Sequence, residues 1–343
     1  MMAQMADTTT AAAPGTDPAR TIRQALKAHS SEVRARFPAL RHQNAIGVAL
    51  MATAAAGMLG SGALYLAGVI PAWVCIPLAA VFASIAHELE HDLIHKMYFP
   101  RRQAIADAML AIGWVLRPNT INPWMRRELH LLHHKIAGSP KDFEERAITN
   151  GEVMGPRRLL MIADSVAAVV LRRMPRAQKL GALKLIARAF FPIGYVHFAV
   201  WYTFVGYHGV QGASALMGAP LDPGAGVLAA MQVVDVLTVV WIAPNVLRSF
   251  CLNFISSNLH YFGDVEAGNV VQQTQVLNRW FFAPFHAFCM NFGSTHAIHH
   301  FWVPEPFYIR QLSAPVAHRV MRAHGVRFND LGTFRRANRW AMA

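Results

Sequence analysis

Histidine is the residue type in this chain whose spacing points most directly to chemistry. Ten of the 17 histidines gather in three tight clusters and one single position, and the pattern His-x-x-His-His occurs twice. These ten are His87, His91, His95, His130, His133, His134, His260, His296, His299 and His300. Neutral imidazole is a common ligand of transition metals, and ten rings exceed what one ion can coordinate. The sequence therefore predicts a site for two metal ions.

The spacing inside the clusters indicates that helices present the rings. His87, His91 and His95 recur every four residues, so on a helix they share one face. Glu88 and Asp92 are also four apart, one position further on, where carboxylates are placed to orient imidazole ligands from behind. In each His-x-x-His-His pattern, positions three and four apart again share one face. We therefore expect each cluster to point inward as a unit.

The composition indicates that these helices belong to a membrane protein. Hydrophobic residues make up 54% of the chain and charged residues 15%, whereas about a quarter is charged in a typical soluble protein. The apolar residues are concentrated in long runs, as in integral membrane proteins. The net charge of +13 favours a basic face against anionic lipid and an acidic protein partner over nucleic acid binding. The three cysteines, widely spaced, offer neither a disulfide framework nor a Cys-x-x-Cys site.

The order of apolar and basic segments predicts four membrane spans. A helix needs about 20 apolar residues to cross a bilayer, and the predicted spans are 45–69, 72–86, 190–207 and 225–247. The second span leads directly into the first histidine cluster. A shorter re-entrant or interfacial helix is expected in 101–118, and interfacial helices are expected in 153–188. The expected organisation is a disordered tail (1–19), a basic interfacial helix (20–42), a membrane domain (43–312) and a basic cytosolic C-terminal segment (313–343).

The distribution of positive charge predicts the orientation of the chain. The linkers 66–73 and 208–224 contain no Lys or Arg, whereas the N-terminal segment, residues 96–188 and the chain after Leu247 are rich in both. Under the positive-inside rule both termini are cytoplasmic, and all the clustered histidines lie on that side. His208 falls on the opposite side and is excluded as a ligand. The predicted fold is an all-α integral membrane protein with four transmembrane helices and a cytosolic helical cap that holds a di-metal histidine cage.

These features resemble a known family. A His-[Asp/Glu]-x-x-His box at a membrane exit, two His-x-x-His-His boxes and four spans are similar to the membrane fatty acid desaturase and hydroxylase superfamily, over roughly residues 45–310. The resemblance implies two Fe ions (Fe2+/Fe3+) in a histidine cage, with O2 as co-substrate. It assigns the first box to His87 and His91, and the other boxes to the clusters at 130–134 and 296–300. His260 resembles an extra ligand that some members place after the fourth span.

The chain departs from the family pattern in two ways. The first box is two overlapping copies, His87-Glu88-x-x-His91 and His91-Asp92-x-x-His95, so either pair or all three histidines are candidate ligands. In addition, nothing in the sequence matches the haem or iron–sulfur module of members with a fused electron donor. We therefore expect an external electron donor, a ferredoxin-like protein or a small cytochrome, on the basic cytosolic face.

Within this reading, the predicted function is oxidation of an unactivated C–H bond in a lipid or fatty acyl chain. Acyl desaturation is favoured, because no motif demands hydroxylation; the alternative is a lipid, alkyl or terpenoid hydroxylase. A distant alternative is a membrane zinc protease, since His87-Glu88-Leu89-Glu90-His91 matches His-Glu-x-x-His, but this leaves the other clustered histidines unexplained. A metal transporter or sensor would need ligands at membrane depth, and these histidines gather at the cytoplasmic surface.

Overall fold

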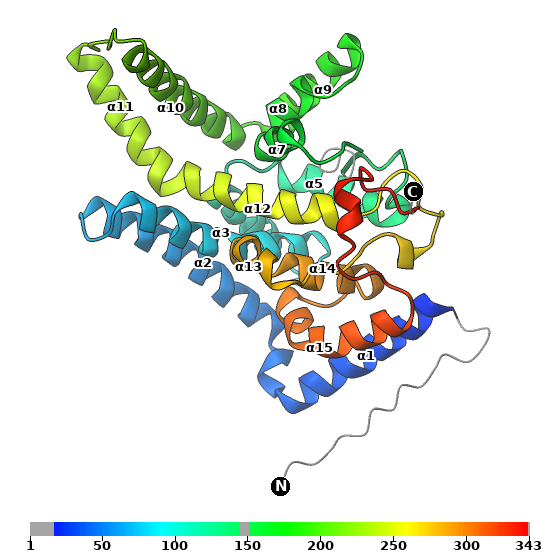
Figure 1. Cartoon of the computed structure of the whole chain (residues 1–343). Coiled ribbons are helices and arrows are strands. Elements are labelled where there is room, and N and C mark those ends of the chain that lie inside the picture. The colour runs from blue at the N-terminus through cyan, green and yellow to red at the C-terminus, as the bar shows by residue number, and fades with distance from the viewer. Residues whose placement is uncertain (1–16, 145–150, 342–343) are drawn as a thin grey trace.

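The fold of the chain is helical, as predicted. The computed structural model describes residues 17–144 and 151–341. In these two ranges the only pairing of extended segments is a pair of isolated β-bridges, His260 with Thr274 and Val276 with Phe328. The helices form two regions in Figure 1: long apolar helices that extend to the left, and a cap of shorter helices around the histidine clusters.

The first two apolar helices form an antiparallel hairpin. α2 (Gln43–Leu66) and α3 (Ala72–Ile94) are each long and apolar enough to cross a membrane. Gly57 of α2 faces Phe82 of α3 so closely that a Cβ atom at Gly57 would overlap the phenyl ring. Small residues allow this close approach between membrane helices. Because α3 continues beyond its apolar part to Ile94, one helix carries His87 and His91, and His95 caps its end.

A second set of apolar helices lies above this hairpin in Figure 1. α11 (Ala225–Leu237), η2 (Thr238–Ile242) and α12 (Ala243–Leu259) form one continuous apolar helix of 35 residues. α9 (Arg176–Phe190) and α10 (Ile193–Leu216) bend by 112° and supply a fourth span if they are counted together. The chain is thus a multi-pass membrane protein with three or four spans. At 35 residues, or about 52 Å at 1.5 Å per residue, the long helix also reaches into the cap.

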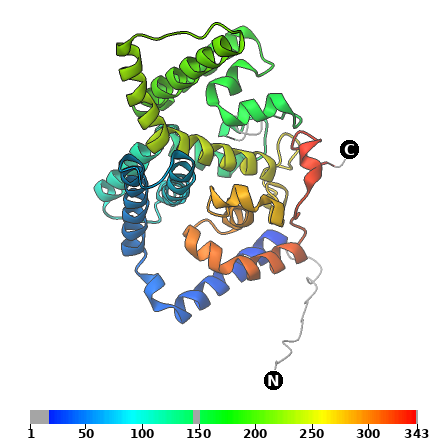
Figure 2. The same ribbon diagram turned by 60° about the vertical axis from the view of Figure 1, so that its left-hand side comes forward.

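The N-terminal helix belongs to the cap. α1 (Pro18–Arg36) begins where the Asp17 carboxylate accepts the Ala19 backbone N–H at 3.0 Å. Ile22 and Leu26 are buried against α14 (Phe292–Phe301) and α15 (Phe307–Ala323). Figures 1 and 2 both show α1 beside α15. The apolar face that the sequence assigned to a membrane surface is therefore used for packing within the protein.

The expected segment boundaries fall at the following places in the structure. Residues 1–16 of the expected tail lie outside the described residues, and Pro18 and Ala19 already belong to α1. The expected boundary between residues 312 and 313 falls inside α15, which continues without a break. The remaining helices of the described residues are α4 (Gln103–Leu116), α5 (Pro123–Ile136), α7 (Pro156–Ala163), α8 (Ser165–Val170), α13 (Ala283–Ala287), η1 (Pro38–Arg41), η3 (Val270–Gln272), η4 (Trp280–Phe282) and η5 (Leu331–Phe334).

Candidate metal centre

Four elements bring the clustered histidines together at the junction of the spans and the cap. The end of α3 carries the first cluster, α5 the second and α14 the third, and His260 is the first residue after α12. Eight of the ten rings are buried, and only His95 and His134 are partly exposed. Helix α5 starts at a strong cap, because the Asn122 side chain accepts the backbone N–H of Trp124 at 3.0 Å. This cap determines where α5 begins.

The first group of converging ring nitrogens joins three helices. His91, His95, His130 and His299 each offer a ligand atom, and these atoms all lie within 4.8 Å of one another. The Nε2 atom of His299 lies 3.0 Å from Nε2 of His95 and 3.0 Å from Nε2 of His134. His134 adds a fifth ring to this group, since its Nε2 lies 3.2 Å from Nε2 of His130.

The second group lies beside the first. His133, His260 and His300 offer ligand atoms within 4.8 Å of one another. The Nε2 atom of His296 lies 3.3 Å from Nε2 of His300, and the ring centroids of His296 and His260 are 5.1 Å apart. The centroids of His134 and His300 are 5.1 Å apart, so the two groups are neighbours. We call the nine rings of the two groups the histidine cage.

The geometry of the cage fits metal ligation better than hydrogen bonding between rings. Metal–nitrogen bonds of about 2.0–2.1 Å place neighbouring ligands at right angles about 3 Å apart, close to the observed Nε2 separations. One proton can bridge one pair of nitrogens, but Nε2 of His299 faces two nitrogens at once. In the described part of the chain neither ring nitrogen of His91 has a hydrogen-bond partner, although the ring is buried. A buried ring nitrogen without a hydrogen-bond partner fits a role as the ligand of a metal ion.

Carboxylates orient two of these rings from outside the cage. Nδ1 of His133 lies 2.8 Å from Oδ2 of Asp142, and Nδ1 of His130 lies 3.0 Å from Oε2 of Glu144. An Nδ1–H that donates to a carboxylate leaves the lone pair of Nε2 for a metal and fixes the ring. Sequence reasoning missed Asp142 and Glu144, because they lie beyond the end of α5, where no periodicity relates them to the cluster.

Neutral oxygen atoms orient two further rings. Nδ1 of His300 lies 3.1 Å from the side-chain oxygen of Gln273, and Nδ1 of His260 lies 3.0 Å from the backbone oxygen of Ser256. Both arrangements again leave Nε2 for a metal. The Gln273 contact joins positions far apart in the sequence, and the Ser256 oxygen carries no side-chain signal. Neither partner was accessible to sequence reasoning.

Glu88 and Asp92 contact an arginine, which differs from the orienting role that the sequence suggested. Nη2 of Arg310 lies 3.1 Å from Oε2 of Glu88 and 3.2 Å from Oδ1 of Asp92. The nearest contact between Asp92 and an imidazole is 3.8 Å, to Nδ1 of His91, which is too long for a hydrogen bond. Asp92 also accepts the backbone N–H of Phe307 at 2.9 Å. These carboxylates therefore join α3 to α15.

His87 lies apart from the cage. Neither group of converging nitrogens contains it. Its Nδ1 lies 3.3 Å from Nη1 of Arg117, and its ring packs 6.2 Å from that of Phe292. Of the two overlapping copies of the first box, the structure thus groups the second pair, His91 and His95.

Histidines outside the clusters have other partners. Nε2 of His208 lies 2.8 Å from Oδ1 of Asp235, in a pair that joins α10 to α11. His286 and His318 bond to backbone oxygen atoms, those of Leu277 at 3.0 Å and Ser294 at 2.7 Å. These three rings have roles in packing.

Burial keeps most cage rings neutral, as metal ligation requires. Burial lowers the pKa of His95 to about 2 and the pKa of His260 to about 3. Burial also lowers the pKa of His296, His299 and His300. For His133, burial again acts to lower the pKa, but the hydrogen bond to Asp142 and the charge of Glu144 outweigh it, and the net shift is upward.

A cavity of about 870 Å³ opens onto the cage. Its wall includes cage rings from both groups, among them His91, His130 and His260. Away from the cage the wall is largely apolar and comes from α7, α8, α9, α10 and α12. Apolar side chains there include Met161, Ala168, Leu185, Ile186, Phe190 and Leu252. The cavity is large enough, and apolar enough, for a hydrocarbon chain.

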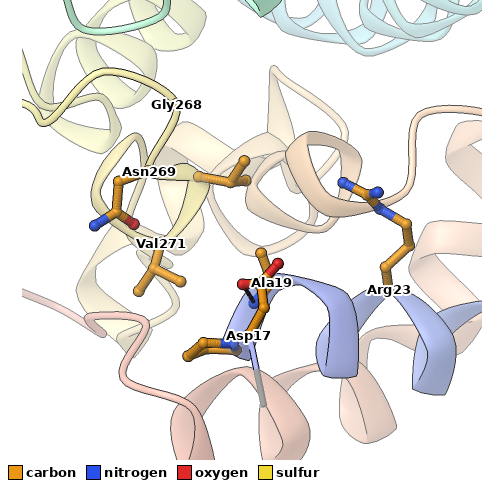
Figure 3. A pocket seen from close by; sticks show the side chains of 8 residues that line it. Asp17, Ala19, Arg23, Gly268, Asn269 and Val271 are labelled. Atoms are coloured by element: carbon orange, nitrogen blue, oxygen red, sulfur yellow. Dashed lines mark hydrogen bonds between the residues drawn. The ribbon is translucent and has the colours of Figure 1, made fainter. Parts of the chain in front are cut away.

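A smaller hollow of about 420 Å³ lies at the start of α1 (Figure 3). Asp17, Ala19 and Arg23 line one side, and the loop around Asn269 lines the other. Arg23 is already used, because its Nε donates to the backbone oxygen of Phe301 at 3.2 Å. The hollow contains no histidine or cysteine among its lining residues, so we assign the chemistry to the large cavity.

The family of the chain agrees with this geometry. The family model for fatty acid desaturases matches residues 67–332, which is more than half of the sequence and includes all ten clustered histidines. The chain therefore belongs to the fatty acid desaturase family, and is a membrane oxidoreductase that acts on lipid. A search of curated proteins gives no match.

Proposed function

We propose that the chain uses O2 and two iron ions to oxidise an unactivated C–H bond of a fatty acyl chain, with desaturation as the outcome. The observation that carries the proposal is that two groups of converging imidazole nitrogens lie on the wall of a largely apolar cavity. Desaturation removes two hydrogens from adjacent carbons, and one O2, two electrons and two protons complete the balance to give two waters. When bound in the cage, iron ions would supply the reduction of O2 and the oxidation of the C–H bond.

The residues of the chain have separate tasks in this reaction. The cage rings would hold the ions, while Asp142 and Glu144 keep two of the rings in orientation. The cavity wall binds the hydrocarbon and excludes water from the cage. Phe292 stacks on the ring of His296 with 4.0 Å between centroids, and so forms an apolar surface where the cavity meets the cage.

The zinc protease alternative is opposed by the same geometry. That mechanism needs His87 and His91 on one metal ion and Glu88 free to act as a base. His87 lies outside both groups of converging nitrogens, and Glu88 is bound to Arg310 at 3.1 Å. Hydroxylation of the same carbon is the second candidate, since it needs the same cage and cavity.

The test of the proposal combines metal analysis with lipid analysis. Purified protein should contain about two iron ions per chain, and expression in a lipid-producing host should yield lipids lighter by two hydrogens. Replacing His133, His134 or His299 by Ala should lower bound iron and abolish turnover. His208→Ala is the matched control and should keep both. A gain of one oxygen would favour hydroxylation, whereas one zinc ion per chain would refute the proposal.

We further propose that an external donor delivers electrons at the exposed edge of the cage. His95 and His134 are the two cage rings that are partly exposed, and each is followed by an exposed lysine, Lys96 and Lys135. Positive side chains at this edge suit an acidic ferredoxin-like protein or a small cytochrome.

A charge reversal tests this docking edge. With reduced ferredoxin as the donor, the double variant Lys96→Glu, Lys135→Glu should raise the KM for the donor by about tenfold or more at low salt. Its iron content should match that of the unaltered chain. An unchanged KM at low salt would contradict this position for the donor.

A further inference from the structure

The wall of the large cavity contains a buried cation without a carboxylate partner. Arg248, on the apolar helix α12, is 1% exposed and lines the cavity. Its Nη2 donates to Oδ1 of Asn119 at 3.1 Å and to Oγ of Ser249 at 2.8 Å, and its Nε to Oδ1 of Asn245 at 3.4 Å. These partners are neutral, and Nη1 has no hydrogen bond within the described ranges. A guanidinium buried in this way is costly unless an anion joins it.

His87 adds a second unused donor to the same wall. An arginine is always protonated and has no acceptor atom, so in the 3.3 Å contact Nη1 of Arg117 donates and Nδ1 of His87 accepts. The ring proton of a neutral His87 is therefore on Nε2. Nε2 is buried and has no partner within the described part of the chain, and His87 lines the cavity. A buried N–H without an acceptor costs free energy, and an oxygen atom of a bound ligand would remove this cost.

These groups lie near one another and near Arg126, because the charges of Arg126 and Arg248 both act on His87 and that of Arg126 acts on Arg248. Arg126 also lines the wall, and its Nη1 donates to Oε1 of Glu90 at 2.7 Å. Arg117 binds the same carboxylate, so the single negative charge of Glu90 is shared by two guanidinium groups. Glu144 also faces Arg126, but it is hydrogen-bonded to His130. Neither of these carboxylates forms an ion pair with Arg248.

We propose that Arg248, His87 and Arg126 form an anion subsite that binds the carboxylate of a free fatty acid. The substrate would then be the free acid, not a thioester or a phospholipid. A carboxylate matches the donors that are left, since it accepts from a guanidinium and an imidazole N–H at once. The apolar wall beyond the subsite, including Leu185 and Phe190, takes the hydrocarbon tail. Binding of a carboxylate at this subsite does not depend on the proposed function. Only the statement that the bound acid is the substrate rests on it.

The position of the subsite determines which carbons reach the iron ions. His87 lies one helical turn before the cage residue His91, or about 6 Å along the axis. Phe292 links the two sites, with its ring 6.2 Å from His87 and 4.0 Å from the cage residue His296. A chain held by its carboxylate at this place presents its first few carbons to the cage. Oxidation is therefore expected next to the carboxyl group and not in the middle of the chain.

Equilibrium binding to the purified iron-loaded protein in detergent tests the subsite without turnover. The probes are radiolabelled dodecanoic acid and its methyl ester, which share the same chain. The unaltered protein should bind the acid about tenfold or more tightly than the ester. Arg248→Met should remove this preference, because it weakens binding of the acid. The affinity for the ester should stay within about twofold of that of the unaltered protein. Arg188→Met is the matched control, because Arg188 is exposed and does not line the cavity.

The possible results separate the subsite from the proposed function. His87→Phe is the second variant, in case Arg248→Met does not fold; it should keep its iron and also lose preference for the acid. Equal binding of acid and ester by the unaltered protein would overturn the subsite, and so would an acid preference that survives in the folded variants. Loss of iron from His87→Phe would show that His87 is a metal ligand of the cage and not part of the subsite. The iron content and lipid oxidation of the unaltered protein decide the proposed function independently.

Discussion

At the scale of single residues, the chemistry depends on which nitrogen of each ring is occupied. Nδ1 of His133 faces Asp142 and Nδ1 of His300 faces Gln273, so Nε2 is left for the cage in both. In His87 the order is reversed, because Nδ1 accepts from Arg117 and the proton is on Nε2. We therefore propose different roles for identical side chains with opposite hydrogen bonds, as a metal ligand and as a donor to substrate.

The carboxylate behind His133 gives a prediction at this scale. The carboxylate of Asp142 fixes the ring of His133 and makes it a more basic ligand. Asp142→Asn removes this negative charge, so we expect iron affinity to fall about 10-fold to 100-fold. Titration of the metal-free protein with Fe2+ measures this change. Glu128→Gln is the control, because Glu128 is exposed on the adjacent helix α5. Equal affinities for Asp142→Asn and the control would contradict the orienting role.

At the scale of elements, the cage depends on how α3 is held against α15. Arg310 of α15 is buried and binds Glu88 and Asp92 of α3. The first box therefore has two roles, one for its histidines and one for its carboxylates. Histidines of α3 enter the cage while the carboxylates beside them lock α3 to the cap, and this contact places α14, which immediately precedes α15, at the correct distance.

Removing Arg310 tests this contact. Arg310→Met leaves two buried carboxylates without a counterion, which costs about 3–5 kcal/mol. We expect a lower melting temperature in detergent and a loss of iron in proportion to unfolding. Arg319→Met, at an exposed position on the same helix, should change stability by no more than about 0.5 kcal/mol. If both variants melt at the same temperature, the ion pairs do not hold α3 and α15 together.

At the scale of the whole molecule, the spans and the cap imply a fixed orientation in the membrane. The turns after α2 and after α10 lie at the ends of the spans away from the cap (Figure 1), and neither contains Lys or Arg. Under the positive-inside rule we expect these turns outside, with the cap and both termini in the cytoplasm. The proposed donor would then share one compartment with the histidine cage.

Cysteine labelling in intact cells tests this orientation. Val69→Cys and Leu221→Cys lie in the two turns, where the native side chains are 66% and 54% exposed. An impermeant maleimide should label both in intact cells, and label Arg319→Cys of the cap only after permeabilisation. The three native cysteines are buried and give a low background. Labelling of Arg319→Cys in intact cells would reverse the assigned orientation.

The sequence by itself determined the helical fold and the membrane class, and it singled out the nine histidines of the cage together with His87, which lies outside it. Helical periodicity and long apolar runs are local properties, so they can be read without tertiary contacts. Membership of the family followed from the same boxes. The ends of the spans were less accessible: α3 and α12 continue past their apolar parts, because burial in the cap replaces lipid around their polar ends.

Only the tertiary structure decided the roles of individual side chains around the site. His87 and His91 have the same local pattern, yet one contacts Arg117 and the other enters the cage. Glu88 and Asp92 bind Arg310, more than 200 positions away, while Asp142 takes the orienting task from a loop. Hydrogen bonds and ion pairs depend on atoms a few ångströms apart, and the spacing of residues along one chain does not specify which distant segments meet.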